Sequence, residues 1–189
     1  MTAADVVRLL PLQKGHFRFE SGHHSDTWID LETLCLRPEA VETLAAELSE
    51  RIAKYDIEAV CGPLVEGAFV ALMVASRLRV LFTYAERFER PSDELYPVQY
   101  RVPRILQPIV HGKRIAIIND VTSAGSAVRG TLADLLKCGA NPVVVGTLAV
   151  LGDTLVKQNK LPLETLVSLP NEIWKPAECP LCARGVVLR

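Results

Sequence analysis

The segment spanning residues 115–128 carries the residue types best suited to chemistry. It is an apolar run that ends in Asn119-Asp120 and continues into small and hydroxyl-bearing residues, Thr122, Ser123, Ala124, Gly125, Ser126 and Ala127. Backbone N–H groups in such a loop, together with the positive end of a helix that begins near Ser126, form a cradle for a phosphate group. Asp120 would then face whatever is attached to the phosphate. A carboxylate at that place suits ribose hydroxyls, directly or through Mg²⁺.

Two other phosphate motifs are excluded in this segment. No Gly-Lys-Ser or Gly-Lys-Thr follows a four-residue spacer, so the segment is not a P-loop, and it lacks the three spaced glycines of a dinucleotide fingerprint. The alternative that stays open is an ordinary strand-to-helix turn in which Ser126 caps the helix.

A second group of reactive side chains is the pair Cys179-Pro-Leu-Cys182. Its spacing is that of half a zinc site, but a tetrahedral site needs four ligands and the sequence offers one such pair. The other cysteines, Cys35, Cys61 and Cys138, are more simply core residues. A structural turn at Cys179–Cys182 is therefore the favoured interpretation, and a metal is the alternative.

The adjacent histidines His23 and His24 are also candidates for a site. Neighbouring residues on a strand point to opposite faces, so we do not expect both to bind one ion. For His24 two interpretations stay open, a solvated turn and a contact with phosphate.

Hydrophobic periodicity predicts the elements that must position these residues. We expect an N-terminal helix capped by Thr2 and extended segments at 15–20 and 28–31. Four prolines exclude a helix within 86–112, where alternation at 98–102 indicates a hairpin arm. The tail after Pro170 is expected to be irregular. The remaining expected elements are helices over 38–54, near 67–78 and from about 126 to 138, and strands over 57–61, 80–84, 115–118, 143–150 and, more weakly, 164–169.

The alternation of strands and helices predicts an α/β fold with a parallel twisted sheet flanked by helices. In such sheets ligands bind beyond the carboxyl ends of the strands. The loops 62–67, 85–88 and 119–126 are therefore expected to meet at one edge and to form the site.

Composition narrows the class of protein. The chain has 189 residues, a net charge of −1 and 49% hydrophobic residues, as expected for a single globular domain. A net charge close to zero gives no indication of a basic surface that would bind nucleic acid or be attracted to an anionic membrane. No apolar run reaches membrane-spanning length, and the first ten residues do not have the pattern of a secretory signal. Five cysteines, an odd number, favour a reducing, cytoplasmic location.

The segment 115–128 resembles the phosphoribosyl-pyrophosphate (PRPP) motif of type I phosphoribosyltransferases, and the resemblance extends over nearly the whole chain. It is strongest to the orotate phosphoribosyltransferase family. Residues 15–26, with their Gly-x-Phe and Ser-Gly-x-x-Ser segments, are similar to that family's N-terminal hood. The tail 178–186 resembles the ending of a bacterial subset of the family.

The resemblance implies a reaction in which a nitrogenous base, orotate above all, takes ribose 5-phosphate from PRPP with Mg²⁺ as cofactor and pyrophosphate as leaving group. Loop 122–127 would hold the 5-phosphate, and Asp120 with Asn119 would hold the ribose. The resemblance further implies a homodimer and one domain over 1–189, with a hood at about 1–36, a core at about 37–170 and an irregular tail at about 171–189. Residues implied on the pyrophosphate side are Gly62, Pro63, Glu66, Gly67 and Arg87, and those on the base side are His24 and Trp28.

The sequence departs from the family at four places. Asn119 stands where the family has a first acid, and the region 86–112, which matches a lysine-bearing catalytic loop, contains no lysine. Leu151 ends a strand where the family usually has Asp-Arg, and His24 replaces a frequent lysine. Two alternatives to an orotate enzyme therefore stay open: a PRPP- or nucleotide-binding regulatory protein with little or no turnover, and a transferase for another base.

Overall fold

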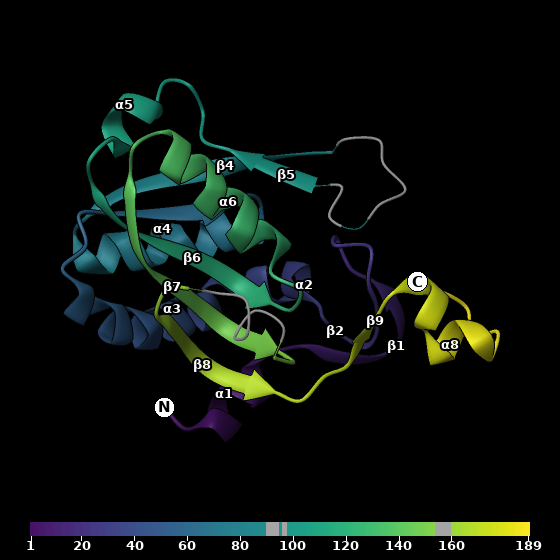
Figure 1. The fold of residues 1–189 in the computed structure, drawn as a ribbon. Helices are drawn as coiled ribbons and strands as arrows, with labels where there is room; N and C mark the ends of the chain where they lie inside the picture. The colour runs from purple at the N-terminus through teal and green to yellow at the C-terminus, as the bar shows by residue number, and fades with distance from the viewer. Residues whose placement is uncertain (90–94, 96–97, 154–159) are drawn as a thin grey trace.

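The chain forms two β-sheets, one large and one small. The computed structural model describes residues 1–89, 95, 98–153 and 160–189. The large sheet consists of β3 (Ala59–Pro63), β4 (Leu81–Glu89), β5 (Val98–Arg101), β6 (Arg114–Thr122), β7 (Asn141–Leu151) and β8 (Leu163–Leu169). The small sheet consists of β1 (Leu12–Arg18), β2 (His24–Ile29) and β9 (Ile173–Trp174). It lies beside the edge of the large sheet toward which β6, β7 and β8 point (Figure 1).

The strands of the large sheet are ordered β5-β4-β3-β6-β7-β8. All neighbouring pairs are parallel except β4 and β5, which are antiparallel. Because the carboxyl ends of parallel strands share one edge, the loops after β3 and β6 meet there. The predicted parallel α/β sheet is confirmed, and so is the hairpin arm at β5.

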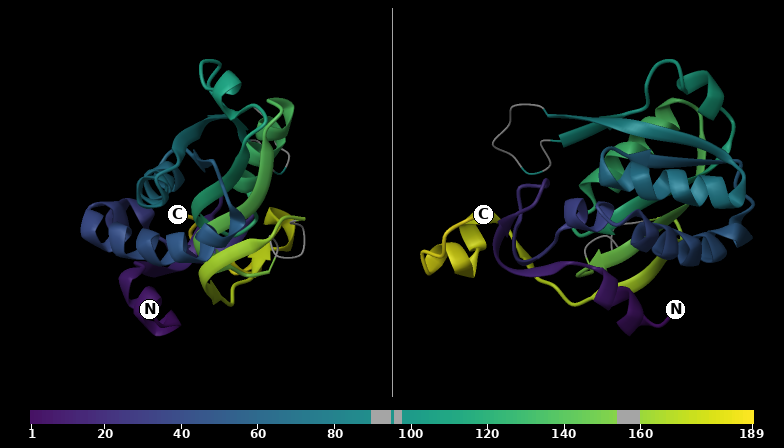
Figure 2. Two further views of the ribbon diagram at one scale, coloured as in Figure 1. Left: turned by 90° about the vertical axis from the view of Figure 1, so that its left-hand side faces the viewer. Right: turned by 180° about the vertical axis from the view of Figure 1, so that it is seen from behind.

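Helices cover both faces of the large sheet. The helices within the described residues are α1 (Ala3–Leu9), α2 (Leu31–Cys35), α3 (Pro38–Ile52), α4 (Glu66–Leu78), α5 (Gln107–Val110), α6 (Ser126–Lys137) and α8 (Pro180–Ala183), with 3-10 turns η1 (Ala53–Tyr55) and η2 (Pro176–Glu178). Helix α8 lies beside the small sheet, not against the large one (Figure 1). Helices α3 and α4 pack together on one face, and α6 packs on the other (Figures 1 and 2). Among the described residues, no helix is both long enough and apolar enough to cross a bilayer.

The central strand β6 shows how the sequence places the core on both faces. Ile115 and Ile117 pack in the cluster that includes Leu135 of α6, whereas Ala116 and Ile118 pack in the cluster that includes Leu44 of α3. A strand covered on both faces is a continuous apolar run rather than an alternating one. This is why the pattern Ile-Ala-Ile-Ile predicted a buried strand.

Four expectations about local structure are wrong. The segment 85–88, expected to be a loop after a strand at 80–84, belongs to β4, which continues to Glu89 because it pairs with β5. Strand β6 continues to Thr122 instead of ending at Ile118, because it pairs with the long strand β7 through Thr122↔Val150. The short helix α5 lies inside the region 86–112, in which the prolines predict no helix. Pro108 occupies its first turn, where no backbone N–H is needed. The tail after Pro170 is not irregular: β9 pairs with β2, and η2 and α8 follow.

The small sheet is built on an antiparallel hairpin of β1 and β2, called here the hood hairpin, whose tip is formed by residues 19–23. Phe17 pairs with Ser25 and Arg18 with His24. The tip closes through a hydrogen bond of 2.8 Å from the Phe19 N–H to the His23 carbonyl. Gly22 has φ +82° there, in the left-handed region that glycine adopts without a steric penalty. The hood hairpin thus brings its tip over the end of the large sheet.

Candidate functional site

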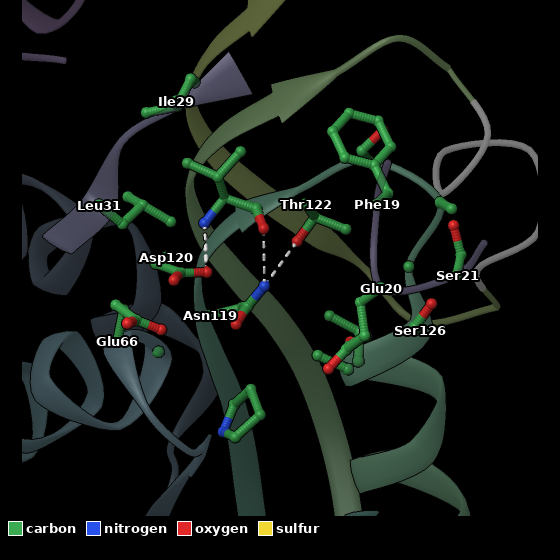
Figure 3. Close-up of a pocket in the computed structure, with 18 of the residues that line it drawn as sticks. Phe19, Glu20, Ser21, Ile29, Leu31, Glu66, Asn119, Asp120, Thr122 and Ser126 are labelled. Carbon is green, nitrogen blue, oxygen red and sulfur yellow. Dashed lines mark hydrogen bonds between the residues drawn. The ribbon is translucent and has the colours of Figure 1, made fainter. Parts of the chain in front are cut away.

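A pocket of about 440 Å³ opens at the edge of the large sheet where β3, β4 and β6 end. Its floor comes from the segments that follow β3 and β6 and from the start of α6. Its roof comes from the hood hairpin and α2 (Figure 3). The structure therefore places the predicted loops 62–67 and 119–126 around one cavity. This is the arrangement expected at the carboxyl edge of a parallel sheet.

The loop between β6 and α6 has the geometry of an anion site. All six residues from Thr122 to Ala127 line the pocket. Gly125 is the residue before the helix and has φ +79°, which turns the chain into α6 without a side chain in the way. The hydroxyl oxygen of Ser123 is buried and has no hydrogen-bond partner within the described part of the chain. An unpartnered hydroxyl beside a helix N-terminus is suited to an anionic ligand.

Asn119 and Asp120 have different roles in this loop. The Asn119 amide donates to the Val121 carbonyl at 2.9 Å and to the Thr122 hydroxyl at 3.2 Å, so it fixes the backbone of the loop. One Asp120 carboxylate oxygen accepts from the Val121 N–H at 2.5 Å, while the side chain lines the pocket (Figure 3). The hydroxyl of Thr147 on β7 donates to the backbone carbonyl of Asp120 at 2.8 Å, and this hydrogen bond ties the end of β6 to β7.

Burial changes the acidity of Asp120. Desolvation, opposed by the Val121 hydrogen bond and assisted by the nearby Glu66 and Glu20 carboxylates, raises the pKa of Asp120 from 3.8 to about 7. Asp120 is 8% exposed, so little water reaches the carboxylate. A buried carboxylate whose pKa is raised by neighbouring negative charge is stabilised in its ionised form when a cation or a hydroxyl-rich ligand binds beside it. Asp120 and Glu66 lie on the same side of the pocket in Figure 3.

An ion pair connects the roof of the pocket to its wall. Nε of Arg87 on β4 donates to Glu20 at the tip of the hood hairpin at 2.7 Å. The Tyr100 hydroxyl on β5 donates to the same carboxylate oxygen at 2.7 Å. Burial raises the pKa of Tyr100 far above its usual value, so its hydroxyl keeps its proton. The predicted cation Arg87 therefore lines the pocket with a partner from the hood.

Two glycines, Gly62 in β3 and Gly67 in the first turn of α4, are explained by close packing. A Cβ on Gly67 would lie 2.5 Å from Oδ1 of Asn119, so any side chain there would displace the loop after β6. A Cβ on Gly62 would lie 2.6 Å from Cβ of Ala71 on α4. Gly62 does not line the pocket, and its contribution is to let α4 approach β3.

The structure brings together nearly all the predicted site residues. Asn119, Asp120, loop 122–127 and Trp28 line the pocket together with Pro63, Glu66, Gly67 and Arg87. His24 does not: its ring faces His16 and Cys182 instead, with Nδ1 of His24 3.3 Å from Sγ of Cys182. The prediction that His24 lies on the base side is corrected by this placement.

Sequence reasoning missed several residues of the roof and wall. Phe19, Glu20 and Ser21 come from the tip of the hood hairpin, and Tyr100 comes from β5. The only signal for them was the Ser-Gly turn at 21–22, which marks a hairpin tip but not what the tip covers. Leu151, noted as a departure, does line the pocket from the end of β7.

Comparison with known proteins agrees with this geometry. Residues 31–180 match the family model described as the phosphoribosyl transferase domain. The orotate phosphoribosyltransferase of Thermotoga maritima is 31% identical over 93% of this chain and 88% of its own length. The crystal structure of orotate phosphoribosyltransferase from Aeropyrum pernix superposes with a TM-score of 0.66 at 21% identity and covers 89% of this chain and 94% of that one. Adenine phosphoribosyltransferase from Thermoanaerobacter pseudethanolicus has a TM-score of 0.71 at 14% identity over 89% of this chain and all of its own, a likeness of fold alone.

Proposed function

This chain belongs to the phosphoribosyltransferase domain family, whose members transfer a phosphoribosyl group from PRPP, and from that premise we propose that its acceptor is orotate. The curated relatives that match almost the whole chain at about 30% identity carry the name orotate phosphoribosyltransferase, which supports this choice. The product would be orotidine 5′-monophosphate, released with pyrophosphate, so the enzyme would serve pyrimidine biosynthesis.

One observation carries the proposal: the phosphate loop, the Asp120 carboxylate and the aromatic roof line a single pocket. PRPP and a planar base present the matching groups, a phosphate, vicinal ribose hydroxyls and a flat ring. In this assignment loop 122–127 holds the 5-phosphate through backbone N–H groups and the Ser123 hydroxyl. Asp120 accepts hydrogen bonds from the ribose hydroxyls, and Arg87, with Pro63, Glu66 and Gly67, faces the pyrophosphate.

In the reaction, a ring nitrogen of the base forms a bond to C1′ while the bond from C1′ to the pyrophosphate oxygen breaks. The leaving pyrophosphate takes the electron pair, and positive charge develops on the ribose. This chain's part is to hold the two reactants in line and to place Asp120 and Glu66 near the developing positive charge. Asn119 contributes by fixing the backbone of the loop rather than by contacting the sugar.

We propose Mg²⁺ as the cofactor, held by the PRPP oxygens together with Asp120 and Glu66. The donors fit, because Mg²⁺ prefers carboxylate oxygens and these two carboxylates are near enough for one to raise the pKa of the other. When bound, the ion neutralises negative charge on the pyrophosphate.

The roof of the pocket supports a planar acceptor. Phe19 and Trp28 both line it, with ring centroids 5.9 Å apart. Leu151, however, presents an apolar side chain where a cation would match the carboxylate of orotate. This observation favours a second candidate function, transfer to an uncharged nucleobase.

We propose that the protein is a homodimer. Val65, Phe69 and Leu72 are 52%, 46% and 51% exposed and follow one another at positions i, i+4 and i+7 along the start of α4. Such an exposed apolar stripe is covered most simply by a second copy of the chain. A cytoplasmic location is proposed from the five free cysteines, which a reducing compartment preserves.

The test is a panel of bases. The purified protein is incubated with PRPP, Mg²⁺ and one of orotate, uracil, adenine, guanine or hypoxanthine, and pyrophosphate release and nucleotide formation are measured together. Orotidine monophosphate formation above all other products supports the proposal. A preference for an uncharged base supports the second candidate. PRPP binding without turnover of any base would support a regulatory binding protein and overturn the enzyme.

A further inference from the structure

A cluster of four side chains lies outside the pocket, at the junction of the hood hairpin and the tail. His16 comes from β1 and His24 from β2, while Cys179 and Cys182 flank the start of α8. One ligand atom of each residue lies within 4.8 Å of all the others. Three of the four residues are buried, and Cys182 is exposed. Within the described residues, no other group of three or more histidine, cysteine or acidic side chains is gathered so that it could hold a metal ion.

Four of the six separations between the ligand atoms lie within about 0.3 Å of those expected for a tetrahedron around one zinc ion. Zinc bond lengths imply about 3.4 Å between two nitrogens and about 3.6 Å between a nitrogen and a sulfur at the tetrahedral angle. Nε2 of His16 lies 3.1 Å from Nδ1 of His24 and 3.4 Å from Sγ of Cys179. The distance from Sγ of Cys182 is 3.8 Å to Nε2 of His16 and 3.3 Å to Nδ1 of His24.

A further hydrogen bond orients one of the histidines for this role. Nδ1 of His16 donates to the carbonyl of Val186 at 2.8 Å. Since a carbonyl only accepts, the ring hydrogen is on Nδ1 and the lone pair of Nε2 points at the other three ligand atoms. A histidine that ligates through one nitrogen and donates from the other to a carbonyl is the usual arrangement around protein-bound zinc.

We propose that His16, His24, Cys179 and Cys182 form a structural Zn²⁺ site. Two thiolates and two imidazoles match the soft-to-borderline preference of zinc, whereas Mg²⁺ and Ca²⁺ take oxygen ligands. Four protein ligands fill the tetrahedron and leave no position for a substrate, so the ion has a structural role. The site is separate from the pocket, because none of the four residues lines it.

The position of the site indicates what it stabilises. His16 and His24 stand on the two strands of the hood hairpin, on either side of the tip that supplies Phe19, Glu20 and Ser21 to the pocket. Strand β9 of the tail pairs with β2 through two residues only, His24↔Trp174 and Ser25↔Ile173. So short a pairing holds weakly by itself. A zinc ion bound by the hood hairpin and by the tail would link these two segments. It would thereby help to hold the hairpin tip over the pocket.

The first experiment measures metal content. The protein is produced in zinc-supplemented medium, passed over a gel-filtration column with reductant, and analysed by plasma mass spectrometry. We expect about one zinc per chain. The Cys182→Ser and His24→Ala variants should lose most of it, by roughly tenfold or more. Cys138→Ser and His23→Gln are the matched controls, a cysteine and a histidine outside the cluster, and should keep it.

A second measurement serves if the ligand variants do not fold. Zinc is removed from the wild-type protein with a chelator under reducing conditions, and the apoprotein is titrated with Co²⁺. Tetrahedral coordination by two thiolates should produce intense visible d–d bands and a thiolate charge-transfer band, and added zinc should abolish both.

The proposal is overturned by any of three results. One is a reduced protein that neither contains zinc nor takes up cobalt, which would make the cluster a hydrogen-bonded group. Another is zinc retained equally by Cys182→Ser and His24→Ala. The third is a Cys179–Cys182 disulfide, seen as the loss of two hydrogens in the intact mass of protein purified without oxidant. None of these readouts depends on transferase activity.

Discussion

The carboxylate of Glu20 lies 2.7 Å from Nε of Arg87, so the tip of the hood hairpin is ion-paired to strand β4 across the mouth of the pocket. The same oxygen accepts the Tyr100 hydroxyl, which places two donors from the sheet on one acceptor from the hood. In the proposed assignment, in which Arg87 faces the pyrophosphate, the incoming ligand would compete with Glu20 for this arginine. We therefore expect the hood and the phosphate ligand to be coupled through Arg87.

Replacing Glu20 tests this coupling. Glu20→Gln should strengthen PRPP binding up to about fivefold at low salt, the range of about 0.2–1 kcal/mol measured for partly exposed ion pairs. The gain should shrink as salt is added, because the attraction is screened. Binding is measured by calorimetry at two ionic strengths. Glu39→Gln, an exposed acid at the start of α3, is the control for loss of net charge. Weaker binding by Glu20→Gln would mean that the ion pair organises the pocket instead of competing with the ligand.

The phosphate cradle is tested at Gly125. Gly125→Val should weaken PRPP binding more than tenfold, since a branched side chain would occupy the phosphate position. It should also cost roughly 1–2 kcal/mol of folding free energy, because φ is +79° there. Gly112→Val carries the same backbone penalty at φ +72°, with no atom near its added Cβ. Gly112→Val should unfold at a urea concentration similar to that for Gly125→Val. It should nevertheless bind PRPP with the affinity of the parent protein. Equal PRPP affinity of the two variants would contradict the assignment.

We expect Asp120 to make PRPP binding depend on pH. With a pKa of about 7, its carboxylate is protonated in the free protein below that pH and ionised above it. PRPP affinity should therefore rise as pH increases through 7. Asp120→Asn should bind more weakly at pH 8 by about 1.5–3 kcal/mol, the worth of a charge-assisted hydrogen bond, and the difference should narrow toward pH 6. A constant difference across this range would remove Asp120 as the titrating group.

The same residue makes the stability of the free protein fall with rising pH. The folded state binds the Asp120 proton more tightly than the unfolded state, whose pKa is 3.8, so the free energy of unfolding decreases between about pH 4 and pH 7. Asp120→Asn removes this dependence and should be more stable than the parent above pH 7, by up to about 4 kcal/mol. Glu66→Gln should show part of the gain, because the Glu66 charge contributes to raising that pKa. Urea unfolding at pH 5 and pH 8 measures both effects.

Asn119→Asp returns a second acid to the loop, but the structure predicts harm from it. The Asn119 amide donates to the Val121 carbonyl and the Thr122 hydroxyl, and an ionised aspartate would face that carbonyl with no hydrogen to donate. The variant should lose about 1–3 kcal/mol of unfolding free energy as it ionises. The loss should be greater at pH 8 than at pH 4 in a thermal melt. An Asn119→Asp protein that is as stable as the parent and more active would show that the ancestral acid pair is still accommodated.

The exposed stripe on α4 predicts the oligomeric state. Phe69→Glu or Leu72→Glu should convert a dimer to a monomer in sedimentation velocity, because each places a charge at the centre of an apolar contact. Leu36→Glu is the control, an apolar residue that is 81% exposed outside the stripe. A protein that sediments as a monomer before any substitution, or a dimer insensitive to both changes, would place the interface elsewhere or remove it.

The sequence predicted the large sheet and its site well because both depend on local patterns. A run such as 115–118 is apolar enough to be a buried strand in any context, and a helix after a small-residue loop follows from its own periodicity. The positions of Asp120 and of loop 122–127 in the pocket then follow from the parallel topology. The end of β6 was misjudged because its last residues are polar, and only the pairing with β7 extends the strand to Thr122.

The hood and the tail were less predictable because their contacts are distant in sequence. Strand β9 consists of Ile173 and Trp174 alone, which is too short for a periodic hydrophobic pattern. These residues form a strand because they pair with β2. The cluster at His16 was missed for a related reason. The spacing of the cysteine pair is that of half a zinc site. The two histidines beside it in the fold lie more than 150 residues earlier in the chain. They belong to strands whose pairing register cannot be predicted from the sequence. His24 was therefore assigned to the wrong partner, the base.

The pairing of β9 with β2 also sets an order of events during translation. The hood hairpin is synthesised early, yet the segment that completes its sheet emerges only after every strand of the large sheet. Until then the nascent chain has a hairpin without its third strand, and two histidines without the cysteines that lie beside them in the folded protein. Closing so long a loop is slow compared with local pairing. The small sheet is thus the last of the two sheets to be completed, and a chain that stops before residue 173 lacks the strand that completes it.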